Sequence, residues 1–199
     1  MGGKMERRKE GPVTEFVRVG AMCRHSPLAG TVPVRLYHSL MAKHRLLKLM
    51  SLWPPLLGAG IRVKRISRDF TEVDVEMKLR VWNQNYVGVH FGGSLYAMTD
   101  PFYMLMLMEN LGREYIVWDK AATVRFKRPG RGRVRAAFRI TREQIDAIRA
   151  EADREAKVEP VFQVRVIDAE GTLVAEVEKT LYVRRKDRIP QQRAGVGAH

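Results

Sequence analysis

The segment spanning residues 92–111 is apolar on nearly every side, and it restricts the possible folds more than any other part of the chain. A helix of this composition has to be covered by protein all round. Asp100 and Pro101 stand at its centre. A charge at that depth of a bilayer is costly, so we expect a helix buried in protein and no membrane span. Pro101 also frees the carbonyl of Ala97, which predicts a kink just after Asp100.

The segments on both sides of this helix alternate apolar and polar residues. Val73 and Val75 alternate with Asp74 and Glu76, for example, which is typical of a strand with one buried face. We expect strands at 61–67, 71–81, 115–127, 133–140, 161–167 and 172–183, and helices at 34–53, 92–111 and 141–156. This order predicts an α+β fold in which a curved, mainly antiparallel sheet wraps around the central helix.

The length of 199 residues suits one domain with tails, and a hydrophobic content of 45% suits a globular core. We place the domain at 34–184, with a flexible basic arm at 1–33 and a polar tail at 185–199. A single cysteine, Cys23, excludes an intramolecular disulfide and fits a reducing compartment. The first residues are charged and lack the apolar core of a signal peptide. These features together predict a cytoplasmic protein.

A formal net charge of +14 favours anionic partners such as nucleic acid, an anionic membrane or a phosphate-bearing cofactor like coenzyme A. The expected helix at 34–53 has an apolar face and a basic face. Such a helix can lie on a membrane, but it more often packs on its own domain with the charged face in solvent.

The segment before the central helix gathers polar residues and glycines around the start of that helix. Asn85, Gly92 and Gly93 precede or open it, and Asp100 lies seven residues after Gly93. Free backbone N–H groups at a helix N-terminus can hold a developing negative oxygen. A carboxylate about two turns further on can act as a base or nucleophile. This combination suits hydrolysis of an acyl group; the alternative is a glycine turn before a buried helix with Asp100 satisfied by hydrogen bonds.

The spacing of Asn85, Gly88, Gly92, Gly93 and Asp100 resembles the pattern N-x-x-G-x-x-H-G-G-x6-D of hotdog-fold acyl-CoA thioesterases of the phenylacetate-pathway type. The segment 124–134, which contains F-K-R-P-G, resembles the F-x-R-P…G turn of the same family. The resemblance covers roughly 61–183. It implies a hotdog fold, an acyl-CoA or another acyl thioester as substrate, and a homodimer or dimer of dimers.

One position departs from the family pattern. Counted from Asn85 and from Asp100, the family's histidine falls on Phe91, while His90 lies one residue early. On a strand or tight turn this shift points the side chain elsewhere. The chain therefore resembles a branch with F-G-G in place of H-G-G, in which His90 serves either as an acid/base group or as a structural residue.

Several further residues are candidates for binding the substrate. Asp119 lies in a strand near the place where related thioesterases put a polar active-site group, although it can equally form an ordinary ion pair with Lys120. A basic run that contains no acid follows, and such a cluster can clamp the phosphates of coenzyme A or simply face solvent. The candidate binding residues are Gly88, Phe91, Asp119, Arg125, Lys127, Arg128 and Arg131.

The sequence thus predicts a thioester hydrolase in which Asp100 attacks or activates water, Gly92 and Gly93 form the oxyanion hole, and Asn85 orients the reacting group, as the resemblance implies. Coenzyme A enters as part of the substrate, and no other cofactor and no metal are expected, because the histidines lack ligand spacing. One alternative is a non-catalytic protein that binds acyl-CoA or acyl chains. A third is a binder of nucleic acid or anionic membrane; the basic segments have few interleaved aromatics, so no specific nucleic acid is expected.

Overall fold

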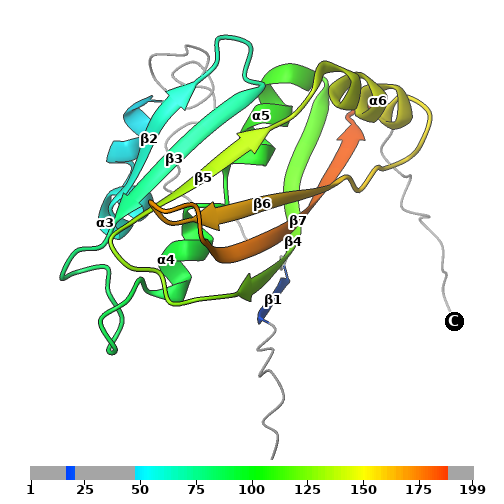
Figure 1. Ribbon diagram of the computed structural model, residues 1–199. Coiled ribbons are helices and arrows are strands. Elements are labelled where there is room, and N and C mark those ends of the chain that lie inside the picture. The colour runs from blue at the N-terminus through cyan, green and yellow to red at the C-terminus, as the bar shows by residue number, and fades with distance from the viewer. Residues whose placement is uncertain (1–16, 21–47, 188–199) are drawn as a thin grey trace, which may run out of the picture.

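One antiparallel sheet organises the molecule, which a computed structural model describes for residues 17–20 and 48–187. The sheet has seven strands in the order β1-β4-β7-β6-β5-β3-β2 (Figure 1). The strands are β1 (Val17–Gly20), β2 (Ile61–Ile66), β3 (Glu72–Lys78), β4 (Tyr115–Phe126), β5 (Arg133–Arg139), β6 (Val161–Ile167) and β7 (Leu173–Arg185). Every expected strand is present, because each alternates buried and exposed residues along its length.

The central helical segment lies against the sheet as two helices, α4 (Gly92–Ala97) and α5 (Phe102–Leu111). They are separated by the turn that contains Asp100 and Pro101, where a break was expected. Pro101 has no N–H to donate, and the carbonyl of Ala97 accepts instead from the N–H of Asp100 at 3.4 Å. Gly112, with φ of 88°, ends α5 as the C-cap. The break takes Asp100 out of regular helix and places its carboxylate on a turn.

The core lies between α5 and the inner face of the sheet. Phe102 and Tyr103 of α5 pack on Phe138 of β5, with ring centroids 5.0 and 5.2 Å apart. Tyr103 also stacks on Phe162 of β6 at 4.5 Å. These contacts fix the helical segment against the sheet and confirm the α+β hotdog architecture expected from the sequence.

The remaining helices close the ends of the sheet. Helix α6 (Arg142–Ala152) begins with the capping box expected at Thr141 and Gln144. It also donates from Arg149 to the carbonyl of Asn110, 2.8 Å away, in the last turn of α5. The 3₁₀ helix η1 (Lys48–Leu52) and helix α3 (Pro54–Ala59) precede β2. Only η1 represents the helix expected at 34–53, because the rest of that segment lies outside the described residues.

Strand β1 departs from the flexible arm expected at 1–33. It pairs antiparallel with β4, Val17 opposite Val124 and Gly20 opposite Ala121. The outer edge of β4 offers unpaired backbone groups at these residues, and a short extended segment satisfies them. The rest of the arm and residues 188–199 of the expected tail lie outside the described part of the chain. No helix in the described ranges is long and apolar enough to cross a membrane.

Candidate active site

Asp100 lies at the break between α4 and α5, and its carboxylate is held on one oxygen only. Its Oδ1 accepts a hydrogen bond from the hydroxyl of Tyr96 and another from Nζ of Lys179, each 2.8 Å long. Nearly half of the side chain (44%) stays accessible. One oxygen is thus fixed by two donors, while the side chain as a whole can still be reached by a substrate.

Lys179 comes from β7 and is completely buried. Its Nζ contacts two carboxylates, Asp100 at 2.8 Å and Oδ1 of Asp119 in β4 at 3.0 Å. The Asp119 oxygen is buried, and its contact with Lys179 is an ion pair at hydrogen-bonding distance. The same ammonium lies 5.4 Å from the centre of the Tyr96 ring. The site is therefore an Asp–Lys–Asp cluster with a tyrosine beside it.

The cluster changes how its members titrate. Burial raises the pKa of Asp119 and the nearby Asp100 raises it further, while the charge of Lys179 opposes both. The pKa of Tyr96 is raised by burial, by its hydrogen bond to Asp100 and by the charges of both carboxylates. Tyr96 therefore stays a neutral donor to Asp100 over the physiological range.

Lys179 is the residue of this site that the sequence analysis missed, although the sequence holds a signal for it. In β7, Val177, Lys179, Leu181 and Val183 share one face of the strand, and all four are buried. A lysine at an inward-facing position of an alternating strand needs a buried partner. Alternation thus indicated an internal charge pair, but it did not indicate the partner, which lies 79 residues earlier.

The turn before α4 presents two backbone donors. The N–H groups of Ser94 and Leu95 bond to the carbonyl of Phe91. Those of Gly92 and Gly93 form no hydrogen bond within the described residues. Both glycines are also tightly approached, since an added Cβ on Gly92 would lie 3.0 Å from the ring of Phe126. These N–H groups can donate hydrogen bonds to a substrate oxygen, the role predicted for them from the sequence.

Phe91 is the N-cap residue of α4 and is more than half exposed. Its ring covers Gly93, because an added Cβ there would lie only 2.4 Å from a ring carbon. An apolar ring thus lies against one side of the glycine turn, at the position where the resemblance led us to compare Phe91 with a histidine.

His90 is buried behind this turn and holds the loop that connects β4 and β5. Its Nε2 donates to the carbonyl of Gly132 at 3.2 Å, and its backbone N–H donates to the carbonyl of Gly130. Nδ1 is buried without a partner within the described residues. Burial lowers the pKa of His90 and the bond to Gly132 opposes this, so the ring is neutral at pH 7. These contacts match the structural alternative; no hydrogen bond or ion pair of the described residues joins His90 to Asp100.

Asn85 organises the loop that projects between β3 and α4 in Figure 1. Its Oδ1 accepts from the backbone N–H groups of Val87 and Val89, each 3.1 Å away. Gly88 takes a positive φ of 76° in the same turn and donates its N–H to the carbonyl of Asn85. The amide oxygen of Asn85 is therefore engaged in the turn, which leaves only its NH₂ group for a substrate.

The predicted phosphate-binding residues lie at the end of β4 and in the loop 127–132 that follows. This loop contacts the glycine turn through His90, and its neighbour Phe126 covers Gly92. Lys127 faces Glu176 at 3.7 Å, and Arg125 is half-buried. Arg128 and Arg131 are exposed. The loop thus brings two accessible guanidinium groups to the side of the site where Gly92 and Gly93 lie.

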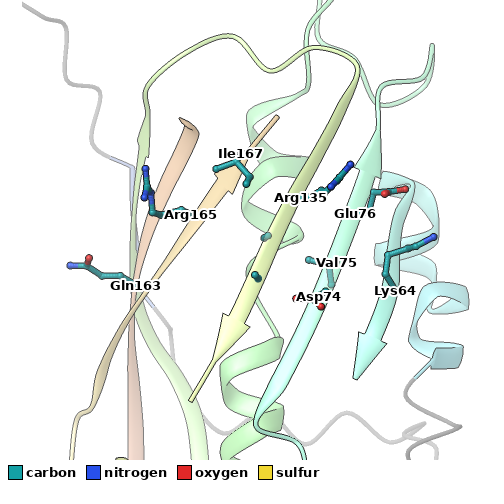
Figure 2. A pocket seen from close by; sticks show the side chains of 10 residues that line it. Lys64, Asp74, Val75, Glu76, Arg135, Gln163, Arg165 and Ile167 are labelled. Atoms are coloured by element: carbon teal, nitrogen blue, oxygen red, sulfur yellow. The ribbon is translucent and has the colours of Figure 1, made fainter. Parts of the chain in front are cut away.

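A separate cavity opens on the outer face of the sheet, where β5 and β6 pair only at Arg135–Ile167 and Ala136–Val166 (Figure 2). It contains none of the candidate residues. Its lining is mixed in charge: Lys64, Asp74, Glu76, Arg135, Gln163 and Arg165, with four apolar residues. Asp74 and Glu76 already pair with Arg139 and Arg133.

Comparisons with known proteins identify the family of this chain. Residues 43–183 match a family described as "Domain of unknown function (DUF4442)". The chain belongs to that family. No curated protein matches the chain.

Solved structures share the fold at low sequence identity. One is a Pseudomonas aeruginosa protein described as "Probable Thioesterase": 22% identity, TM-score 0.64, covering 77% of this chain and 97% of that one. Another is a thioesterase of Haemophilus influenzae: 17% identity, TM-score 0.54, covering 72% and 91%. A third is a protein with unknown function from Chlorobaculum tepidum: 14% identity, TM-score 0.59, covering 71% and 94%. These likenesses confirm the hotdog fold of this family member.

Proposed function

We propose that this protein is an acyl-CoA thioesterase in which Asp100 drives attack on the thioester carbonyl. The observation that carries the proposal is the state of Asp100. It is a carboxylate at a helix break, with one oxygen held by Lys179 and Tyr96 and much of the side chain accessible. The thioesterase descriptions of proteins with the same fold support the same class of reaction.

The reaction needs a base, an oxyanion site and a place for the coenzyme. Asp100 takes a proton from water as the water oxygen bonds to the carbonyl carbon, and the resulting oxyanion binds the N–H groups of Gly92 and Gly93. Collapse of this intermediate breaks the C–S bond, and the proton on Asp100 passes to the departing thiolate. In the direct variant, the Asp100 oxygen bonds to the carbonyl carbon, the C–S bond breaks and coenzyme A leaves as the thiolate; water then hydrolyses the acyl anhydride, which frees the acid and the Asp100 carboxylate and releases the proton that the thiolate takes up. Asn85 contributes its NH₂ group, and Arg128 and Arg131 bind the phosphates of coenzyme A.

Thioester hydrolysis across short, medium, long and aryl acyl-CoAs tests the proposal. Asp100→Asn and Asp100→Ala should lose at least about a hundredfold in kcat/KM, the usual contribution of a positioned base. Asp146→Asn, which changes an exposed carboxylate on α6, is the matched control and should keep full activity. Activity that is indifferent to both Asp100 variants contradicts the mechanism. Single turnover in H₂¹⁸O separates the two routes, because only the direct attack places ¹⁸O in the Asp100 carboxyl.

A non-catalytic acyl-CoA binder is the second candidate, and Phe91 is the observation that favours it. An apolar ring covers Gly93 where the family pattern has a histidine. Calorimetric titration with a non-hydrolysable thioether analogue of acyl-CoA tests this function. Tight binding together with no turnover on the whole substrate panel would select it over the thioesterase.

A further inference from the structure

A strand that served only to build the sheet would not need a buried lysine at position 179. Its neighbours across the sheet are Ala122 in β4 and Phe162 in β6, both buried and apolar. A methionine or leucine at this position would pack without any cost of desolvating a charge. The chain instead places a cation here and surrounds it with Asp100, Asp119 and the ring of Tyr96.

The charges of the cluster do not cancel. Two carboxylates meet one ammonium, so the cluster carries an excess negative charge when all three groups are ionised. Burial is also uneven, since the Asp119 side chain is 25% exposed and that of Asp100 is 44% exposed. The more accessible carboxylate is the one that two donors hold by a single oxygen.

We propose that Lys179 is a positioning residue of the active site: it fixes Oδ1 of Asp100 and leaves the other oxygen for the substrate, while Asp119 supplies the second counter-charge for the buried ammonium. This inference rests on the proposed function of Asp100. It gives each residue of the cluster a separate role. Asp100 touches the substrate, Lys179 acts through Asp100, and Asp119 acts through Lys179.

The effect of removing the Lys179 ammonium depends on the groups that face it. They are Asp100 at the helix break, Tyr96 on α4 and Asp119 on β4. The cation on β4 next to Asp119, Lys120, points to Glu159 instead. Without Lys179, two like charges share one half-buried site, and one of them will bind a proton more readily. Loss of activity at low pH is therefore the readout that separates a charge role of Lys179 from a packing role.

The pH dependence of kcat/KM in Lys179→Met tests the proposal. The acid limb should move upward by at least about one pH unit, so that the variant loses at least about tenfold near neutral pH and recovers part of this at higher pH. The double variant Lys179→Met/Asp119→Asn removes the cation together with its counter-charge. It should fold with fewer unpaired buried charges, and its acid limb should return toward that of the wild type. A uniform loss of kcat with an unmoved acid limb, in both variants, overturns the positioning role.

A second readout does not depend on turnover. The ¹³C signal of the Asp119 carboxyl can be followed against pH in the wild type and in Lys179→Met. Because the charge of Lys179 lowers the pKa of Asp119, its removal should raise that pKa further. A shifted titration in a protein that hydrolyses no thioester overturns the proposed function alone. Hydrolysis by a protein whose Asp119 titration is unmoved overturns the inference about Lys179 alone.

Discussion

At the scale of single residues, the hydroxyl of Tyr96 is the smallest group whose removal tests how Asp100 is held. Tyr96→Phe deletes one hydrogen bond to Oδ1 and leaves Lys179 in place. A hydrogen bond to a charged group contributes about 1.5–3 kcal/mol, of which only the part that differs in the transition state affects the rate. We expect kcat/KM to fall by about tenfold. Tyr182→Phe, a tyrosine on β7 opposite Trp118, is the matched control, and equal losses in both variants would contradict the expectation.

His90 makes stability depend on pH with a definite sign. Burial lowers its pKa below the ordinary value of 6.5, so the unfolded chain takes up a proton at a pH where the folded protein does not. The free energy of unfolding should therefore have its full value above about pH 7. It should decline as the pH falls through 6.5, by at most about 1.4 kcal/mol per pH unit. Urea denaturation at pH 7.5 and 5.5 measures this. His90→Asn should flatten the decline, and parallel curves would contradict the assignment.

The same residues indicate how far sequence reasoning reached. Asp100 stood out because a carboxylate within an apolar segment needs a partner, and Asp119 stood out by its place in a strand. The structure brings both to one cluster. Lys179, which joins the two carboxylates, was missed: the alternation of β7 marks it as an inward-facing lysine, but its contacts join β7 to a helix break and to β4, and local sequence does not identify such distant partners. Asn85 and His90 show the converse: local spacing singled them out, while Asn85 bonds to backbone groups of its own loop and His90 to backbone groups of the loop 127–132.

At the scale of elements, substitutions at two glycines, one closely packed and one in open space, test the packing of the loop that supports the site. An added Cβ on Gly130 would lie 2.9 Å from Val174 and 3.3 Å from the ring of His90, both buried. On Gly58, inside α3, it would meet nothing within 4 Å. Gly130→Ala should thus destabilise by about 1–3 kcal/mol, because neither neighbour can move freely. Gly58→Ala should stabilise by about 0.5–1 kcal/mol. Thermal or urea unfolding decides, and equal effects would contradict the packing described.

The loop 127–132 makes a separate prediction about the coenzyme. If Arg128 and Arg131 bind the phosphates, replacing both with glutamine should raise KM for acyl-CoA about tenfold or more and leave KM for acyl-pantetheine, which lacks these phosphates, unchanged. Arg62 and Arg113, two exposed arginines elsewhere, serve as the control pair. A matching rise in KM for both substrates would mean that the loop only shapes the site.

Element boundaries followed closely from the sequence for some strands, whereas the strongly alternating segment 71–81 ends earlier than expected, at Lys78 of β3. The expected strand at 161–167 coincides with β6, and that at 133–140 differs from β5 by one residue. The central segment kept its extent but divided into α4 and α5, since Pro101 ends the hydrogen bonding of the first helix. Strand β1 was not expected, because its pairing depends on the open edge of β4 and not on its own four residues.

At the scale of the whole molecule, the surface beside the site is unusually apolar. The loop between β3 and α4 exposes five large apolar side chains, Val81, Trp82, Tyr86, Val87 and Phe91, and Phe126 beside Gly92 is exposed as well. Several exposed large apolar side chains on one loop are typical of an interaction site. Within the described residues, the outer edge of strand β4 is paired with β1 only at residues 121–124.

These two surfaces lead to the prediction of a homodimer or a dimer of dimers. Burying the exposed loop against a second chain would also shield the glycine turn from water, which strengthens the electrostatic interactions of the site. Light scattering coupled to size exclusion should give a mass of at least two chains at micromolar concentration. The double variant Trp82→Glu/Val87→Glu should shift the protein toward the monomer and lower kcat as well. Trp118→Glu changes an exposed tryptophan on β4 and distinguishes an interface formed by the loop from one formed by the edge of the strand. A wild type that is monomeric and fully active would mean that each chain builds a complete site alone.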